Sequence, residues 1–308
     1  MKKIRLALLS GGDTPERDVS LNSGQQVYEA LDKNKYDIVR YDPKTDLALL
    51  VAQAASIDVA LLILHGPNGE DGTVQGLLDL LKIPYQGAGV LGSALAMNKL
   101  AAKEMYIQAQ IPVPEHLVIH KSMTRDTAYY VEKLGLPLVV KPVCAGSSVG
   151  MSIVREEKEL AAAIQTALSF DDVVMVETYV DGVELTCGVL GNDTLEALPV
   201  IEILPGEGFE FFDYTAKYTP GATEEICPAR IEDAVRDQVQ AHAMAAHNAL
   251  FLKGYSRTDM ILSQGHLYVL ETNTIPGMTA TSLYPQAAQV AGYSFPMLLD
   301  RLIALAME

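Results

Sequence analysis

The sequence predicts an α/β fold, α+β in part, built from more than one domain. Three observations lead to this prediction. The first third of the chain alternates apolar strands with helical stretches, the last third mixes closely spaced strands with one long helical stretch, and the chain is long enough for several cores. With 308 residues, 49% of them hydrophobic, it can bury the interior of two or three domains.

Residues 1–97 are expected to form a small N-terminal domain with a parallel sheet. The pattern of buried strands occurs in "IRLALLSGG" and "VALLILHG", and helical spacing occurs in "SGQQVYEALDK" and "TVQGLLDLLK". This βαβ order is typical of a parallel sheet. The opening apolar run is very short and enters Gly-Gly-Asp without a small-residue cleavage site, so we interpret it as a first strand rather than a signal peptide.

Two further domains are expected, at residues 98–183 and 184–308. The central segment has strands in "LPLVVKP" and "DVVMVETYV", with helical stretches in "DTAYYVEKLG" and "EKELAAAIQTAL". The last segment has strands in "ELTCGVLG", "LEALPVIEI", "SRTDMIL" and "HLYVLETNT", and a long helix in "IEDAVRDQVQAHAMAAHNALF". The linkers are short, so the domains should pack around a shared cleft.

Charge and cysteine usage restrict the class of protein. The formal net charge is −16, which argues against a general nucleic-acid binder. No apolar run approaches the length that spans a membrane. Cys144, Cys187 and Cys227 are odd in number and far apart, without zinc spacing or a disulfide framework. A cytoplasmic protein is therefore expected.

The stretch "LETNTIPGMTATS" carries the first indication of chemistry. If Ser263, Gln264 and Gly265 form a three-residue hairpin loop, four polar residues of the two strands point to one face. They are Arg257, Asp259, Glu271 and Asn273. Two carboxylates and an amide form an oxygen site suited to Mg²⁺. A solvated strand face with a salt bridge explains these four residues equally well.

Phosphate-binding features elsewhere favour the cation site. A buried strand ends in Lys141 and leads into a Gly- and Ser-rich stretch at residues 145–150, which can offer N–H groups and hydroxyls to phosphate. This stretch is not a P-loop, because no Gly-Lys-Ser/Thr follows. Lys99, at a helix start in the same segment, could be a second cation.

The first segment has acidic residues where a dinucleotide-binding loop would have glycines. The pattern G-x-G-x-x-G is absent after the first strand, and Glu16 would repel a pyrophosphate and attract an ammonium group. A glycine-rich loop after a later strand carries His65, Glu70 and Asp71. Such loops hold ligands in α/β folds, although a lone loop histidine is more often structural.

The chain resembles the D-alanine–D-alanine ligases of the ATP-grasp superfamily. The resemblance rests on six motifs in their family order: "HGPNGEDGTVQG", "IPYQGAGVLGSALAMNK", "KPVCAGSSVGM", "FFDYTAKY", "RTDM" and "ETNTIPGMT". It covers nearly the whole chain. It implies a three-domain ATP-grasp fold, with ATP between the central and C-terminal domains. The implied reaction joins two D-alanines through a D-alanyl phosphate, for peptidoglycan synthesis in a bacterium.

The resemblance implies roles for the strand face and the lysines. Asp259, Glu271 and Asn273 would hold two Mg²⁺ (or Mn²⁺) ions that bridge the ATP phosphates. Lys99 and Lys141 would contact the α- and β-phosphates.

The remaining ATP contacts follow from the same resemblance. Lys217 would bind the γ-phosphate, Glu177 the exocyclic amine of adenine, and Glu184 the ribose hydroxyls. The backbone of Val180 would meet the edge of the ring.

The amino-acid sites are implied in the same way. Glu16 would hold the ammonium group of the first D-alanine, with His65 nearby. Ser282 and Leu283 would receive the carboxylate of the second D-alanine.

Two further groups would serve the reaction itself. Arg257 and the N–H of Gly277 would form the oxyanion site. Hydrogen bonds among Glu16, Ser147 and Tyr218 would tie a closing loop over the intermediate.

The chain departs from the family pattern at a few positions, and rival functions remain open. Val143, Cys144 and Ala145 stand where the family commonly has polar or charged residues in the phosphate-covering loop. The rivals are a D-alanine–D-lactate or D-alanine–D-serine ligase and a non-catalytic nucleotide-binding regulator. The resemblance further implies a homodimer, with ATP and D-alanine as ligands and neither nucleic acid nor membrane as partner.

Overall fold

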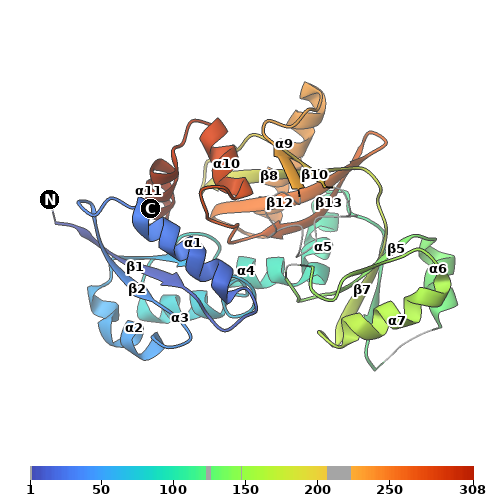
Figure 1. The fold of residues 1–308 in the computed structure, drawn as a ribbon, viewed down its shortest axis with the longest axis horizontal. Coiled ribbons are helices and arrows are strands. Elements are labelled where there is room, and N and C mark those ends of the chain that lie inside the picture. The colour runs from blue at the N-terminus through green and yellow to red at the C-terminus, as the bar shows by residue number, and fades with distance from the viewer. Residues whose placement is uncertain (1, 123–125, 147, 207–222) are drawn as a thin grey trace.

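The computed structural model describes residues 2–122, 126–146, 148–206 and 223–308. Its strands form three sheets, which are arranged along the molecule with helices packed on their faces (Figure 1). Within the described residues, no helix is both long and apolar enough to cross a membrane.

The first sheet is parallel and has the order β2-β1-β3, as the βαβ pattern predicted. Its elements are β1 (Ile4–Ser10), α1 (Arg17–Ala30), β2 (Tyr36–Tyr41), α2 (Leu47–Gln53), η1 (Ala54–Ser56), β3 (Val59–Ile63) and α3 (Thr73–Leu81). Successive residues of β1 face opposite sides of the sheet. Leu6 and Leu8 pack in a cluster with Val27 of α1, whereas Ala7 and Leu9 pack in a second cluster with residues of α2 and α3.

The central sheet is antiparallel, with the order β4-β7-β5-β6. Its elements are β4 (His116–His120), α6 (Thr127–Leu134), β5 (Leu138–Pro142), β6 (Ser152–Val154), α7 (Glu157–Leu168) and β7 (Val173–Thr178). Helix α7 begins at a capping box between Glu156 and Glu159, which satisfies backbone N–H groups at the helix start. The sheet and its two helices form a core of their own.

The third sheet has six strands in the order β11-β10-β8-β12-β13, with β9 paired to β8. Its strands are β8 (Val183–Gly191), β9 (Glu196–Ala197), β10 (Ile201–Pro205), β11 (Thr223–Ile226), β12 (Gly254–Ser263) and β13 (His266–Asn273). Five helices complete the described chain: α4 (Val90–Met97), α5 (Lys99–Gln108), α9 (Asp233–Ala249), α10 (Leu283–Val290) and α11 (Phe295–Ala306).

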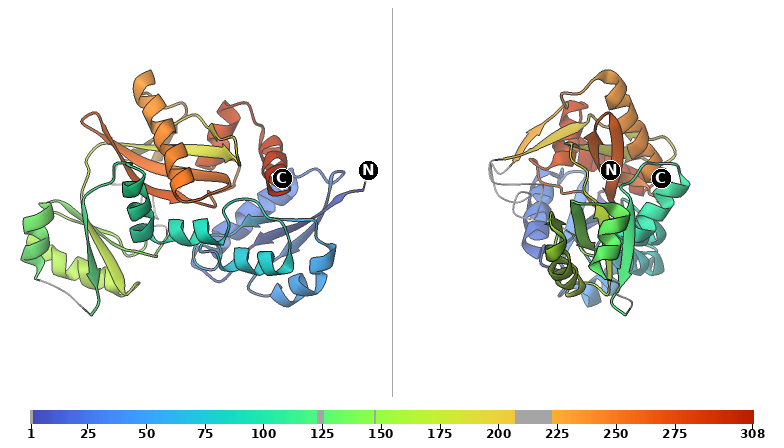
Figure 2. Two further views of the ribbon diagram at one scale, coloured as in Figure 1. Left: turned by 180° about the vertical axis from the view of Figure 1, so that it is seen from behind. Right: turned by 90° about the vertical axis from the view of Figure 1, so that its right-hand side faces the viewer.

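The first and third sheets share a hydrophobic core. Leu8 and Leu61 of the first sheet belong to one buried cluster with Leu298 and Leu302 of α11. Figures 1 and 2 show α11 beside the first sheet, whereas the central sheet lies at the other end of the molecule. Helix α5 packs with α9 and β13, and the Tyr106 hydroxyl donates to the Thr272 hydroxyl at 2.7 Å. The domain limits at residues 97/98 and 183/184 stay a prediction.

The predicted polar residues of β12 and β13 do lie on one face of the hairpin, but the loop that joins the strands differs from the predicted one. Ser263 pairs with His266, so the connecting turn has two residues and the predicted three-residue loop is wrong. A two-residue turn alone would put the polar residues of the two strands on opposite faces. A shift in the strand register brings them back to one face, because Asp259 pairs with Glu271 while the next residue of β12 pairs with Val269. The unpaired extra residue is Leu270, which forms a β-bulge. Bulges of this kind re-aim side chains next to active sites.

Candidate active site

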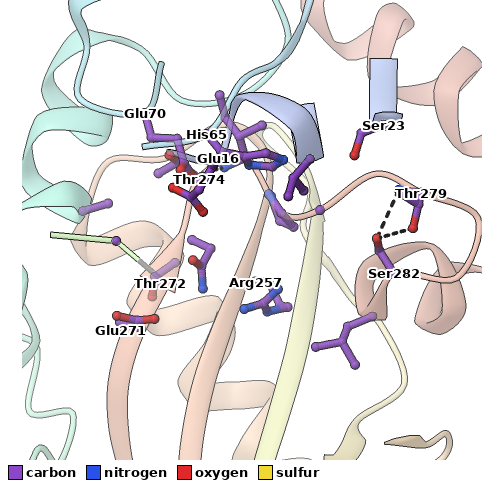
Figure 3. A pocket seen from close by; sticks show the side chains of 18 of the residues that line it. Glu16, Ser23, His65, Glu70, Arg257, Glu271, Thr272, Thr274, Thr279 and Ser282 are labelled. Carbon is purple, nitrogen blue, oxygen red and sulfur yellow. Dashed lines mark hydrogen bonds between the residues drawn. The ribbon is translucent and has the colours of Figure 1, made fainter. Parts of the chain in front are cut away.

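The predicted substrate residues line one cavity of about 1000 Å³. The cavity lies between the loops of the first sheet, the start of α5, and the ends of β12 and β13. Figure 3 shows Glu16, His65 and Glu70 grouped on one side, Arg257 and Glu271 on the strands, and Ser282 apart from them beside Thr279. The predicted residues that line it are Glu16, His65, Lys99, Arg257, Glu271, Asn273, Gly277, Ser282 and Leu283.

Asp259 is the centre of the polar face of the hairpin. Its carboxylate accepts hydrogen bonds from Arg257 Nε at 2.9 Å and Arg257 Nη2 at 2.7 Å. It also accepts from Asn273 Nδ2 at 3.0 Å and from the Thr186 hydroxyl at 2.6 Å. Only 6% of the residue is exposed. These bonds fix the carboxylate and the guanidinium relative to each other.

The donor set of this face fits Mg²⁺. The bulge places Glu271 directly opposite Asp259, and Asn273 lies opposite Arg257. Lys99 Nζ is 3.7 Å from Glu271 Oε2. In the described part of the chain, no group of three or more His, Cys, Asp and Glu side chains is arranged as a metal site. Two carboxylates and an amide oxygen leave coordination positions open for phosphate and water. Mg²⁺ commonly keeps several water ligands and binds substrate phosphates in proteins.

Glu16 lies at the N-terminus of α1, between two glycine loops. A Cβ atom added to Gly66 would be 3.0 Å from Glu16 Oε2, and one added to Gly146 would be 3.5 Å from it. The carboxylate therefore uses the space that both glycines leave. His65 is nearby and buried; burial and the charge of Arg257 lower its pKa, although Glu16 opposes the shift. A neutral imidazole beside Glu16 leaves the carboxylate as the group suited to an ammonium.

Glu70 joins the loop of the first sheet to the turn after β13. Its carboxyl accepts from the backbone N–H of Gly66 at 2.8 Å and from that of Ile275 at 3.4 Å. Burial raises its pKa to about 8, and the nearby charges of Glu16 and Glu271 act in the same direction. At neutral pH this side chain is therefore largely protonated in the folded protein.

The raised pKa of Glu70 predicts a pH dependence of stability. The unfolded carboxyl ionises near pH 4.5, whereas the folded one keeps its proton to about 8. Stability should therefore fall as pH rises through this window, by an amount on the order of a few kcal/mol. Glu70→Gln, which cannot ionise, should flatten the decline in melting temperature between pH 5 and 8.5. Exposed Glu132→Gln is the matched control. Equal slopes for Glu70→Gln and wild type would contradict the prediction.

Ser282 is the residue before α10, near the predicted oxyanion donor. Its Oγ accepts from the backbone N–H of Thr279 at 3.1 Å and bonds the Thr279 hydroxyl at 2.7 Å. A Cβ atom added to Gly277 would be 3.1 Å from this Oγ, so the glycine permits a close approach. The N-terminus of α10, which starts at Leu283, can attract a carboxylate.

A second cavity, of about 130 Å³, lies between the central and third sheets. It is lined by the residues predicted to bind the nucleotide, Lys99, Lys141, Glu177, Val180 and Glu184, together with Asp259 and Glu271. Lys99 and Glu271 line both cavities, so the two cavities meet at these residues. A nucleotide in the smaller cavity could present its phosphates to a substrate in the larger one.

Family comparison agrees with this arrangement. Residues 105–304 match the family model described as D-ala D-ala ligase C-terminus, and residues 44–88 match the one described as D-ala D-ala ligase N-terminus. The chain belongs to the D-alanine–D-alanine ligase family. A D-alanine–D-alanine ligase of Syntrophobacter fumaroxidans is 60% identical over 100% of this chain and 99% of its own length. One of Desulfotalea psychrophila is 57% identical over 100% and 96%.

Solved structures of the ligase family have the same fold. The D-alanine–D-alanine ligase of Bacillus anthracis complexed with ATP has a TM-score of 0.87 at 35% identity, and the match covers 99% of this chain and 97% of that one. The VanG D-Ala:D-Ser ligase of Enterococcus faecalis has a TM-score of 0.87 at 35% identity, with 99% and 100% covered. The predicted α/β ATP-grasp fold is thereby confirmed.

The structure adds one residue to the ligase site that the sequence analysis missed. Lys103 of α5 is wholly buried and lies 2.6 Å from Glu177. A signal was present, because Lys103 follows Lys99 by four residues and so shares its helix face. Its partner, however, is distant in the sequence.

Three predicted residues lie outside the described residues: Ser147, Lys217 and Tyr218. Their predicted roles, in closing the loop and in binding the γ-phosphate, stay predictions. Lys99 Nζ, at the start of α5, donates to the carbonyl of Ala145, two residues before Ser147, at 2.6 Å.

Proposed function

We propose that this protein joins two D-alanines with ATP, through a D-alanyl phosphate, to form D-alanyl-D-alanine. The observation that carries the proposal is the meeting of the two cavities at Lys99 and Glu271, beside Asp259. One cavity has groups suited to a nucleotide, and the other has a carboxylate suited to an amino group. The names of relatives up to 60% identical support the same substrates.

ATP would lie in the smaller cavity. Glu177 and the backbone of Val180 would meet adenine, and Glu184 would bind the ribose. Lys99 and Lys141 would face the phosphates. Two Mg²⁺ (or Mn²⁺) ions, held by Asp259, Glu271 and Asn273, would offset the charge of the transferring phosphoryl group.

The larger cavity would hold the amino acids. Glu16 would bind the ammonium group of the first D-alanine. The carboxylate of that D-alanine would then face the γ-phosphate. Transfer of that phosphoryl group to the carboxylate gives an acyl phosphate and ADP, which turns a poor electrophile into a reactive one.

Formation of the peptide bond follows in the same cavity. The deprotonated amine of the second D-alanine attacks the acyl carbon, and inorganic phosphate leaves. Arg257 and the N–H of Gly277 would stabilise the tetrahedral oxyanion. The N-terminus of α10, with Ser282 and Leu283, would hold the carboxylate of the second substrate.

D-serine is the second candidate for the attacking substrate. The D-Ala:D-Ser ligase of Enterococcus faecalis has the same TM-score and identity to this chain as the ATP-bound ligase of Bacillus anthracis. Overall shape therefore supports both substrates equally. The names of the most similar relatives described above favour D-alanine.

The decisive experiment measures ADP release and dipeptide formation together. ADP release should require Mg²⁺ and D-alanine, and the product should be D-alanyl-D-alanine. L-alanine should not support turnover, because Glu16 and the oxyanion donors fix the substituents of the α-carbon. D-serine and D-lactate should compete poorly as second substrates. ATP hydrolysis that is indifferent to D-alanine would refute the proposal.

We further propose that the protein is a cytoplasmic homodimer that supplies the dipeptide for peptidoglycan. The support is the family resemblance, together with the need of the reaction for ATP. Sedimentation analysis of the purified protein would test the dimer, and a monomer at micromolar concentration would contradict it.

A further inference from the structure

Three charged side chains form a buried group beside the smaller cavity, which is called the nucleotide cavity below. Glu177 on β7 is 3% exposed, Lys141 on β5 is 7% exposed, and Lys103 on α5 is 0% exposed. One carboxylate oxygen of Glu177 contacts Lys141 Nζ, and the other lies 2.6 Å from Lys103 Nζ. In addition to this ion pair, Lys103 Nζ donates a hydrogen bond to the Pro114 carbonyl at 3.3 Å. Two cations thus share one buried anion.

The three groups influence each other's ionisation. Although burial favours the neutral carboxyl, the ammonium groups of Lys141 and Lys103 hold the pKa of Glu177 at about 2. Burial lowers the pKa of Lys103 to about 8, and Lys141 contributes to this shift while Glu177 opposes it. His116, opposite Glu177 on β4, has its pKa lowered by burial and by Lys103. Glu177 is therefore fixed as an ionised carboxylate.

The two lysines differ in their access to a ligand. Lys141 and Glu177 line the nucleotide cavity, whereas the wholly buried Lys103 lies behind Glu177. In the proposed function, Lys141 turns its ammonium group towards phosphate, which takes away part of the counter-charge of Glu177. Lys103 has no such second ligand, so its charge stays with the carboxylate. The charge of Lys103 therefore acts on the nucleotide mainly through Glu177, because its other contact is the backbone carbonyl of Pro114, which lines the cavity but carries no charge.

We propose that Lys103 is a positioning residue that makes the site selective for a 6-aminopurine nucleotide. It does so by keeping Glu177 ionised and fixed while the nucleotide is bound. An ionised carboxylate can only accept hydrogen bonds. It pairs with the 6-amino group of adenine and repels the 6-oxo group of hypoxanthine. This inference rests on the proposed function, in which Glu177 faces the amino group.

Lys103→Met tests the inference through nucleotide selectivity. Methionine has a similar length and an apolar end. The variant keeps the ion pair between Glu177 and Lys141, in which one positive charge balances one negative charge, so the fold should be kept. With ATP and ITP compared at saturating D-alanine and Mg²⁺, the ratio of their kcat/KM values should fall at least ~10-fold, the scale of one charge-assisted hydrogen bond. The KM for ATP should rise, while kcat with ATP changes less than about 2-fold, because Lys103 is remote from the reacting atoms.

Two comparisons separate this role from a general structural one. Lys121→Met removes an exposed lysine, paired with Asp172, from the turn that follows β4 and should leave the ratio unchanged. In a Glu177→Gln background, Lys103→Met should cause no further change in the ratio, because the carboxylate through which it acts is gone. Melting temperatures of all variants report folding.

Different outcomes would overturn the role of Lys103 and the proposed function. An unchanged ratio in folded Lys103→Met, or an equal loss of kcat with both nucleotides, would overturn the role of Lys103. Wild-type protein without D-alanine-dependent ATP turnover would instead overturn the proposed function. If Lys103→Met folds poorly, Lys103→Gln provides the same test, since it keeps a donor for Glu177 without the charge. Its ratio should fall between those of wild type and Glu177→Gln, and a wild-type ratio would overturn the inference.

Discussion

Asp259→Asn should lower kcat by at least ~10²-fold, the scale of one lost electrostatic contact in a transition state. The carboxylate accepts from two nitrogens of Arg257 and from Asn273, so an amide nitrogen at either oxygen position faces a donor of Arg257. The guanidinium then loses its fixed orientation. The change also removes a charge from the proposed Mg²⁺ site. The measurement is kcat at saturating ATP and D-alanine over a range of Mg²⁺ concentrations.

The same substitution should also reduce stability. Only 12% of the Arg257 side chain is exposed, so the hydrogen bonds that it loses to Asp259 are not readily replaced by bulk water. A loss of roughly 1–3 kcal/mol is expected from the unmet hydrogen bonds. Asp172→Asn is the control, because Asp172 is 80% exposed and pairs only with a surface lysine among the described residues. Normal turnover in folded Asp259→Asn would show that this face does not serve the reaction.

Arg257→Lys should lower kcat by ~10²- to 10³-fold, the range measured for loss of an oxyanion donor. Lysine keeps the charge but cannot reproduce the two parallel bonds to Asp259. Its compact ammonium group would lie elsewhere in the cavity. Because Arg257 lines the larger cavity, the KM for ATP should change little. Steady-state kinetics with ATP varied at saturating D-alanine give both values.

An exposed arginine provides the control for this conservative change. Arg236→Lys lies on α9 and pairs with Asp233 and Asp237 at the surface, so it should be kinetically silent. A rise in KM for D-alanine with unchanged kcat in Arg257→Lys would place Arg257 in substrate binding rather than in stabilising the oxyanion.

Local patterns in the sequence were sufficient for the first sheet, and together with the family resemblance they identified several polar residues that line the larger cavity. Strand β1 was identified from an unbroken apolar run, and its two faces each meet helices, as such a run predicts. The shared face of Asp259 and Glu271 was also predicted, but from the wrong loop, and their direct pairing was not predicted. The letters Ser-Gln-Gly fit a loop of two or three residues. The bulge at Leu270 depends on pairing along the whole hairpin, which no local pattern reveals.

Contacts between distant segments explain what the sequence analysis missed. Lys103 and Glu177 come from a helix and a strand whose meeting depends on packing of α5 between the sheets. Glu70 was noted as a loop residue, but its contact with the Ile275 backbone joins segments about two-thirds of the chain apart. Burial of these groups follows from tertiary packing, and so do their shifted pKa values.

The shared core of the first sheet and α11 has a consequence for how the chain folds during synthesis. Leu8 and Leu61 are made long before Leu298 and Leu302, which belong to the same cluster. The nascent first sheet therefore exposes part of an apolar face until α11 has left the ribosome, and such surfaces favour aggregation. The central sheet has its own core and can fold earlier. Emergence of α11 from the ribosome, rather than synthesis of the first strands, should be the step that completes the N-terminal half of the active site.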